Sequence, residues 1–290
     1  MRFILIFILF IIYAQAQTIL VINSNYSISK YKQTQEAFAQ NFDEKFKSID
    51  ISSMTPKEIK DYLYNEYPDI VYTIGSRAYQ YAYKYIPEKK IFFSSIVNWK
   101  RLPKKEHFSG VLVELHSGMF LTMIRSMYKK FKKLGIIYSE YTKDVVSSLE
   151  DSSKHVGLKI ITQKISSKDD IKIDSLLKQT DGLIIIPDPI VLGTKDVVID
   201  IFTRAKAYKN PIIAYDKLFI NYGAVLSISV DNPTIGRQIA TMIKGYMKKT
   251  DTHNIQYPTG THVTFNKKSA KELELDLKNI EFINIDEIVE

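Results

Sequence analysis

Asp188 is the residue whose position most strongly indicates ligand chemistry. It lies in the segment Asp181–Pro189, DGLIIIPDP, where the apolar run Leu183–Ile186 ends abruptly in prolines. A short apolar run rich in β-branched residues predicts a strand buried on both faces of a parallel sheet. Ligands bind beyond the carboxyl ends of such strands, so we expect the Asp188 carboxylate in an open loop at a ligand cleft. An aspartate that only stabilises a proline-rich turn is the alternative.

Other polar and aromatic residues follow predicted strands in the same way. The candidates in the first half of the chain are Ser24, Asn25, Gly75, Ser76, Ser94 and Ser95. The candidates in the second half are Ser139, Tyr141, Asp188, Tyr215 and Asp216. Because parallel strands bring their carboxyl ends to one rim, we expect these residues to line a single ligand-binding cleft.

These residue types suit a small zwitterion or an aromatic ligand. Asp188 or Asp216 would accept a charge-assisted hydrogen bond from a ligand's amino group. Gly75-Ser76 would begin a helix whose free backbone N–H groups hold a carboxylate or another anion, although N-capping by Ser76 explains the same pair. Aromatic residues beside the strand ends would stack on a flat ligand; these are Trp99, Tyr141 and Tyr215. An amino acid-like or aromatic ligand is therefore expected.

Sequence signatures of catalysis are missing. The chain contains no G-x-S-x-G, G-x-G-x-x-G or P-loop segment. Its five histidines, at positions 107, 116, 155, 253 and 262, lack the i, i+4 spacing of a helical metal site. The absence of cysteine excludes disulfides, thiolate metal ligands and a lipid-anchored cysteine. We expect a binding protein without cofactor or metal rather than an enzyme, with a secreted hydrolase as the minor alternative.

The N-terminus indicates export. Arg2 precedes an unbroken apolar segment, Phe3–Tyr13, which is too short to span a membrane as a helix. Ala14-Gln15-Ala16 then has the A-x-A pattern of a cleavage site. We expect Met1–Ala16 to be a secretory signal, the mature chain to begin at Gln17, and the protein to be periplasmic without a lipid anchor. An uncleaved membrane anchor is the alternative.

The net charge of +8 does not by itself indicate nucleic-acid binding. The lysines occur in dispersed pairs, such as Lys129-Lys130 and Lys248-Lys249, rather than in one block. Such pairs are typical of solvated helix ends. With 45% hydrophobic and 25% charged residues, the chain has the composition of a globular protein. We expect a monomer that binds a small molecule and no nucleic acid.

Two successive sets of strands, alternating with helices, position the candidate residues. The predicted strands of the first set are Thr18–Ser24, Ile49–Ile51, Ile70–Ile74, Lys90–Ile96 and Val111–Leu115. Those of the second set are Leu134–Tyr138, Leu158–Ile165, Leu183–Ile186, Pro211–Tyr215 and Ala224–Val230. Such alternation predicts βαβ units and parallel sheets. No Ser/Gly-rich linker divides the sets, so we expect an α/β fold of two lobes joined by direct crossings.

One segment, Gly223–Met247, resembles a known family. Its sequence is GAVLSISVDNPTIGRQIATMIKGYM, in which Gly223 opens a strand, Asp231 ends it and Gly236-Arg237 opens the next helix. This order is similar to that of the ABC-transporter substrate-binding family that includes tryptophan- and tyrosine-type importers. The resemblance extends over roughly Gly110 to Phe265.

The resemblance implies the α/β type I periplasmic-binding fold, in which two Rossmann-like lobes with parallel sheets enclose a ligand cleft. It implies three crossings between the lobes, near Glu114–Ser117, Ser229–Asn232 and Tyr257–Val263. The N-terminal lobe would comprise residues 17–115 and about 231–258, and the C-terminal lobe residues 116–230 and about 259–290. An ABC permease is the implied partner; a membrane signalling receptor is the alternative, because the same fold serves both.

Two segments depart from the family pattern. Ser139-Glu140-Tyr141-Thr142 stands where the family commonly has an Asn-Pro turn, and Asn98-Trp99-Lys100 corresponds to no family residue. Both segments lie where ligand contacts are expected, so the resemblance does not imply which ligand is bound.

Overall fold

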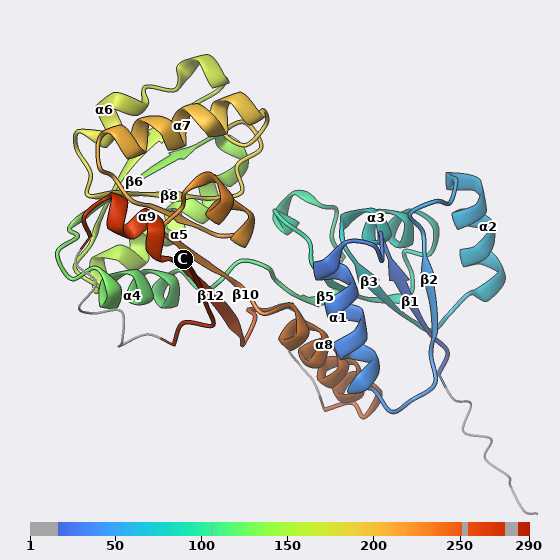
Figure 1. Ribbon diagram of the computed structural model, residues 1–290. Helices are drawn as coiled ribbons and strands as arrows, with labels where there is room; N and C mark the ends of the chain where they lie inside the picture. Colours follow the sequence, from blue (N-terminus) through green and yellow to red (C-terminus); the bar gives the residue numbers. More distant parts are fainter. Residues whose placement is uncertain (1–16, 106, 251–254, 276–283) are drawn as a thin grey trace, which may run out of the picture.

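The computed structural model describes residues 17–105, 107–250, 255–275 and 284–290, and it places two α/β lobes side by side (Figure 1). The expected secretory signal, Met1–Ala16, lies outside the described residues. Each lobe has helices on both faces of one sheet. The predicted α/β fold, with two sheets that are mainly parallel, is confirmed.

The first lobe contains a six-stranded sheet in which every pair of strands is parallel. The strand order is β11-β5-β4-β3-β1-β2. The bounds are β1 Ile19–Asn23, β2 Lys47–Asp50, β3 Ile70–Ile74, β4 Lys90–Ser94, β5 Ser109–Val111 and β11 Ile255–Gln256. The central strands β1 and β3 are buried along their whole length. This burial explains their continuous apolar sequences, since helices cover both faces.

Two helices cover each face of this sheet. Phe38 on α1 and Ile235 on α8 pack with Val21 on one face. Leu63 on α2 and Ala78 on α3 pack on the other face. The helix bounds are α1 Ser29–Gln40, α2 Pro56–Glu66, α3 Ser76–Tyr85 and α8 Asn232–Met247. α8 therefore belongs to this lobe by packing, although it follows strand Leu226–Val230 of the other lobe.

The second lobe contains a seven-stranded sheet of order β13-β12-β10-β9-β8-β6-β7. Only the β10–β12 pair is antiparallel. The strand bounds are β6 Lys133–Tyr138, β7 Lys159–Lys164, β8 Gly182–Ile185, β9 Ile212–Ala214, β10 Leu226–Val230, β12 Thr261–Asn266 and β13 Glu287–Val289. The apolar run before Asp188 thus forms β8, which is buried at every position, as its sequence predicts.

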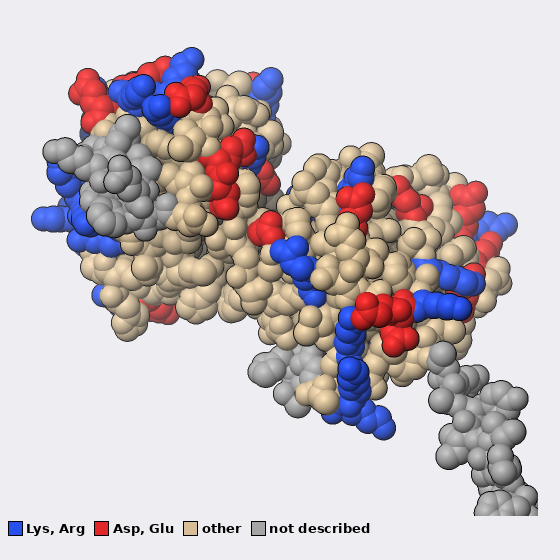
Figure 2. Space-filling view, turned by 60° about the horizontal axis from the view of Figure 1, so that its bottom comes forward, with Lys and Arg blue, Asp and Glu red and all other residues tan. Residues whose placement is uncertain are grey.

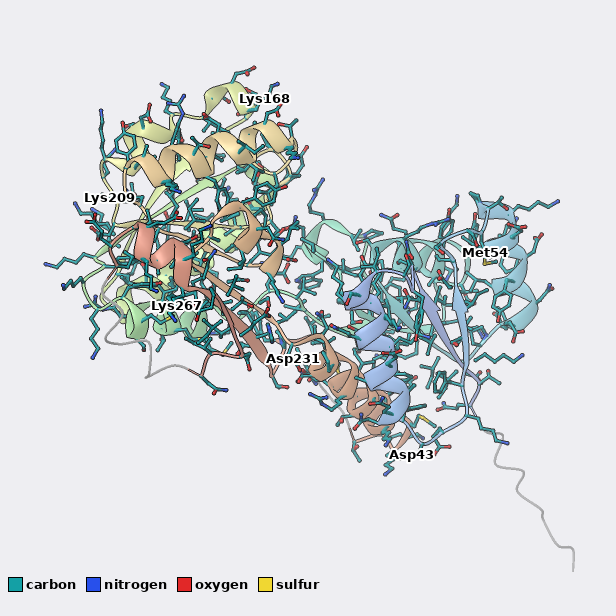
Figure 3. The ribbon with its side chains drawn as sticks, viewed as in Figure 1. Asp43, Met54, Lys168, Lys209, Asp231 and Lys267 are labelled. Carbon is teal, nitrogen blue, oxygen red and sulfur yellow. The ribbon has the colours of Figure 1, made fainter. Side chains whose placement is uncertain are left out.

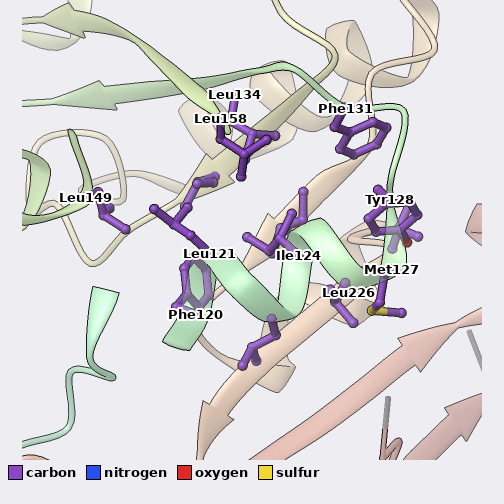
Figure 4. Close-up of a cluster of buried hydrophobic side chains, with 14 of the residues drawn as sticks. Phe120, Leu121, Ile124, Met127, Tyr128, Phe131, Leu134, Leu149, Leu158 and Leu226 are labelled. Carbon is purple, nitrogen blue, oxygen red and sulfur yellow. The ribbon is translucent and has the colours of Figure 1, made fainter. Parts of the chain in front are cut away.

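Helices also cover both faces of the second sheet. α4, α5 and α9 pack on one face and α6 and α7 on the other. Figure 4 shows Leu121 and Ile124 of α4 directed at Leu134, Leu158 and Leu226 of the strand layer. The bounds are α4 Ser117–Met127, α5 Lys143–His155, α6 Ile173–Leu177, α7 Lys195–Ala207 and α9 Lys267–Glu272. Short 3₁₀ helices lie in the connections of the described chain: η1 Trp99–Arg101, η2 Glu140–Thr142, η3 Lys168–Asp170 and η4 Lys217–Tyr222.

The chain passes between the lobes at three places. β5 leads to α4, β10 leads to α8, and β11 leads to β12. Asp231 lies at the second crossing, at the start of α8 (Figure 3). Its backbone N–H donates to the carbonyl oxygen of Gly260 in the third crossing, at 3.1 Å. Two crossings are thereby held together, which favours a common hinge. Whether the lobes move as units with the boundaries given above stays a prediction.

No helix in the described part of the chain is long and apolar enough to cross a membrane.

Candidate ligand-binding cleft

A cavity of about 810 Å³ lies between the two lobes, and Figure 2 shows the groove that separates them. Residues of the first lobe form one wall; they include Ile28, Lys30, Gln33, Ser95 and Val97. Residues of the second lobe form the other; they include Phe120, Ile184, Ile186, Pro187, Tyr215, Asp216 and Lys217. Each of the three crossings contributes to the lining of the cavity: Glu114 lies in the first, Asp231 in the second and His262 in the third.

Ser95 and Glu114 present polar atoms that no other protein group satisfies. Ser95 is 4% exposed, its backbone has the left-handed φ of 58°, and its Oγ lacks a hydrogen-bond partner. Glu114 Oε2 is likewise buried without a partner. Burial raises the pKa of Glu114. Hydrogen bonds from the backbone N–H groups of Glu114 and Asn98 and the positive charge of Lys100 act to lower this pKa, but burial outweighs them. Both groups line the cavity.

The three other carboxylates of the lining have partners within the protein. Glu287 lies 2.5 Å from Lys217 and 3.6 Å from His262. The hydrogen bond from Lys217 is the main cause that lowers the pKa of Glu287. Asp231 caps α8 by accepting from the backbone N–H of Thr234 at 2.9 Å, and Asp216 caps η4 by accepting from the N–H of Leu218 at 2.9 Å. The described residues offer no cluster that could hold a metal ion.

Three of the predicted site residues line the cavity: Ser95, Tyr215 and Asp216. Burial raises the pKa of Tyr215 to about 12, with a smaller contribution from the charge of Asp216. The Tyr215 ring packs 5.6 Å from the ring of Phe219, so its orientation is fixed by the apolar core. It presents a neutral aromatic side chain to a ligand.

The predicted anion cradle at Gly75-Ser76 does not line the cavity. Ser24 is buried, and its Oγ accepts a hydrogen bond from the backbone N–H of Ala78 at 3.0 Å. Gly75 has φ 87°, and a Cβ there would meet Ser24 Oγ at 2.7 Å. Side-chain packing therefore fills the turn in which an anion was expected. The turn is therefore a capped start of a helix, which was the alternative prediction. Ser24 rather than Ser76 accepts the hydrogen bond from the helix backbone.

Two further first-lobe candidates have structural partners instead of facing the cavity. Ser94 is buried, and its hydroxyl lies 2.7 Å from the hydroxyl of Tyr72. The Asn25 side chain accepts hydrogen bonds from Ser27, at 2.9 Å from the backbone N–H and 2.6 Å from the hydroxyl. Neither residue belongs to the cavity lining. Ser95, which follows Ser94 directly after the end of β4, does line it.

Asp188 is buried in the second lobe, and the expectation of an open loop is wrong. It is 0% exposed and does not line the cavity. Its Oδ2 accepts from the backbone N–H and the hydroxyl of Ser139, both at 2.7 Å, and from the Thr142 hydroxyl at 2.5 Å. Its Oδ1 accepts from the N–H groups of Ile190 and Val191, at 2.9 and 3.1 Å. The carboxylate thus joins the loop after β6 to the loop after β8, as the structural alternative describes.

A short loop of the first lobe reaches across to the second lobe. We call Val97–Arg101 the bridging loop. Asn98 Nδ2 donates to the carbonyl oxygen of Pro187 at 3.0 Å, and Lys100 Nζ lies 3.2 Å from Asp144. The guanidinium of Arg101 lies 4.1 Å from the ring centre of Tyr141. Tyr141, predicted to contact ligand, is 50% exposed and contacts this loop instead.

Sequence reasoning missed several polar lining residues that lie in the crossings: Glu114, Ser117, Ser229, Asp231, Asn232 and His262. The missed signal was the position of the crossings themselves. Segments that cross between two lobes necessarily lie beside the cleft between them. Their polar residues were therefore candidates for ligand binding on the same grounds as the residues that follow strands. Lys30 and Gln33 of α1 carried no comparable signal.

The sequence model of a family described as ABC transporter substrate binding protein matches residues 35–283. No curated protein matches the chain significantly. A ligand-free, open structure of a substrate-binding protein with adhesive properties from Clostridium difficile has a TM-score of 0.73 at 17% identity, covering 94% of this chain and 99% of that one. A complex of an ABC domain with L-Trp from Streptococcus pneumonia has a TM-score of 0.61 at 15% identity, covering 93% and 100%. A conserved domain protein from Vibrio cholerae has a TM-score of 0.61 at 15% identity, covering 94% and 99%.

Proposed function

The chain belongs to the ABC transporter substrate binding protein family, and on that premise we propose that it captures a small organic solute between its lobes and delivers it to an ABC importer. The observation that carries the proposal is the cavity of about 810 Å³, which both lobes line and the crossings border. This volume lies within the range of about 300–1,000 Å³ that is typical of small-molecule sites.

The lining favours an amino acid-like or aromatic solute. Apolar side chains from both lobes, including Val113, Phe120 and Ile186, supply most of the contact surface, and the neutral ring of Tyr215 lies among them. A few polar groups, such as Ser95 and Glu114, would fix the orientation of the solute. An apolar cavity with a small number of polar groups is the usual form of a specific site for a small molecule.

Capture would proceed by closure of the lobes. A solute that contacts Ser95 in the first lobe and Tyr215 in the second would bind the closed arrangement more tightly than an open one. Only such a difference in affinity shifts the equilibrium between the two arrangements. The paired crossings at Asp231 and Gly260 would serve as the hinge. The closed form is what an importer would recognise.

We expect a thermal-shift screen of amino acids, aromatic amines, nucleosides and organic acids to identify a stabilising solute. At a concentration 100 times its Kd, a ligand stabilises the native state by about 2.7 kcal/mol. Small-angle scattering with the same solute should show a smaller radius of gyration, because the lobes approach each other. A screen with no stabilising solute in any class would contradict the proposal; a stabilising solute without compaction would contradict closure alone.

Delivery to an importer requires export. We expect intact-mass measurement of exported protein to show a chain that begins at Gln17, because the Ala14-Gln15-Ala16 motif suits cleavage by signal peptidase. A retained Met1–Ala16 segment, with the protein in the membrane fraction, would contradict both the cleavage and the periplasmic location.

A further inference from the structure

Two side-chain oxygen atoms in the cleft, one of Ser95 and one of Glu114, have no hydrogen-bond partner among the described residues. The described residues include five buried side-chain oxygen atoms without a partner, and two of them, Ser95 Oγ and Glu114 Oε2, belong to residues that line the cavity. The other three belong to Tyr128, Ser227 and Thr264, which do not line it. Buried polar atoms in native proteins are normally paired. Two oxygen atoms without a partner in one binding cavity therefore indicate that the solute supplies hydrogen-bonding groups there.

The fold brings these two groups to the same edge of the first sheet. Ser95 directly follows β4 and Glu114 lies three residues after β5. β4 and β5 are paired in parallel, with Phe93 opposite Gly110. A Cβ at Gly110 would meet the Phe93 carbonyl oxygen at 2.5 Å, so glycine permits the close approach of the two strands. The left-handed backbone of Ser95 fixes its hydroxyl at this position.

No basic side chain of the described residues forms an ion pair with Glu114. Lys217, which also lines the cavity, pairs with Glu287, and Lys100 pairs with Asp144. Among the described residues, the carboxylates that line the cavity belong to Glu114, Asp216, Asp231 and Glu287, and the lysines that line it are Lys30 and Lys217. The cavity therefore favours a positive group, and Glu114 is the carboxylate in it with a free buried oxygen.

From these observations, and resting on the proposed capture function, we propose that Ser95 and Glu114 form an amine subsite that selects solutes bearing a protonated nitrogen. An ammonium group carries three donors and no acceptor. It would donate to Glu114 Oε2 and to Ser95 Oγ and would balance the carboxylate charge. A neutral solute would leave the Glu114 carboxylate without a balancing charge, and an organic anion would meet like charge.

The test compares probes that share one ring and differ in charge: tyramine, tyrosine and 3-(4-hydroxyphenyl)propionate, each alongside its aliphatic counterpart. We expect the nitrogen-bearing probes to raise the melting temperature of the wild-type protein and the nitrogen-free acids to leave it unchanged. Glu114→Gln should weaken binding of the amines by about ten- to a hundredfold, as expected for the loss of a charged hydrogen bond. Ser95→Ala should weaken it by a smaller factor. Glu150→Gln makes the same change at an exposed glutamate of α5 and should leave affinity unchanged.

The possible outcomes separate the subsite from the capture function. A nitrogen-free solute that binds as tightly as any amine, or an unchanged amine affinity in Glu114→Gln, would overturn the amine subsite and leave capture intact. Failure of all solutes, charged or neutral, would overturn capture and the subsite together. The ligand-free Glu114→Gln protein should melt at or above the wild-type temperature, because it no longer buries an unpaired charge. A large loss of apo stability would instead assign Glu114 a structural role and contradict the proposal.

Discussion

Asp188→Asn is expected to lower the free energy of unfolding by about 2–4 kcal/mol. The wild-type carboxylate accepts five hydrogen bonds, all from the protein, and it is fully buried. An asparagine of the same size keeps one oxygen but turns an NH₂ group toward donors. Either the Ser139–Thr142 donors or the Ile190–Val191 donors then lose their acceptor. Urea unfolding of the ligand-free protein at neutral pH measures the loss.

Asp169→Asn provides the matched control, because Asp169 is exposed in the second lobe. We expect the control to unfold within about 0.5 kcal/mol of the wild type, as is usual for exposed substitutions. An Asp188→Asn protein as stable as the control would show that the carboxylate does not hold the two loops together. Loss of solute affinity with unchanged stability would return Asp188 to the ligand site.

The same residue gives a pH dependence with a defined sign. Burial acts to raise the pKa of Asp188, but the hydrogen bonds from Thr142, Ser139 and Val191 outweigh it, and the pKa lies below its usual value. The Asp188 carboxyl group therefore binds a proton less tightly in the folded protein than in the unfolded chain, where the pKa of aspartate is about 3.9. The stabilisation is fully present above that pH and is lost as the pH falls through the folded pKa. The difference between wild type and Asp188→Asn should therefore be largest at neutral pH and shrink below about pH 4; a constant difference would contradict this account.

The fold was predictable because its signals are local. β1, β3 and β8 are buried on both faces and carry continuous apolar sequences, which identify parallel-sheet strands. α2 begins with Thr55 as N-cap and Pro56 in its first turn, both of which are sequence signals. The antiparallel partner of β10 was not predictable in this way. The third crossing returns the chain to the second lobe at the edge where β10 ends, with Thr261 opposite Val230, so β12 runs back antiparallel to β10.

The site was less predictable, because burial at a strand end depends on residues far away in sequence. Asp188 has the sequence of an exposed turn residue, yet its partners Ser139 and Thr142 lie 49 and 46 positions away. Ser94 and Ser95 are adjacent, but only Ser95 lines the cavity, and its left-handed backbone has no sequence signal. A residue that follows a parallel strand can be predicted to lie at the edge of the sheet that faces the cleft. Whether its side chain turns toward the cleft or into the lobe is decided by tertiary packing.

Gly236→Ala is expected to lower the free energy of unfolding by about 1–3 kcal/mol. This loss is expected even though alanine inside a helix is more favourable than glycine by about 1 kcal/mol. The Gly236-Arg237 pair is part of the family resemblance, and the structure explains why position 236 requires glycine. α8 packs so closely on α1 that a Cβ at position 236 would meet the Thr34 carbonyl oxygen at 2.2 Å and the Phe38 nitrogen at 2.8 Å. Backbone atoms cannot yield as a flexible side chain would, so α8 must move away from α1.

That movement should also weaken solute capture, because α8 begins at the second crossing. Asp231 caps this helix and binds Gly260 of the third crossing through its backbone N–H, so a displaced α8 would shift the hinge. We expect Gly236→Ala to melt at a lower temperature than wild type and to bind the stabilising solute of the screen less tightly. Thr241→Ala, an exposed position on the same helix, removes a hydroxyl without adding a contact and should leave both properties nearly unchanged. A Gly236→Ala protein that matches Thr241→Ala in melting temperature would show that α1 and α8 can separate without cost, and the close contact would then not be what requires glycine at this position.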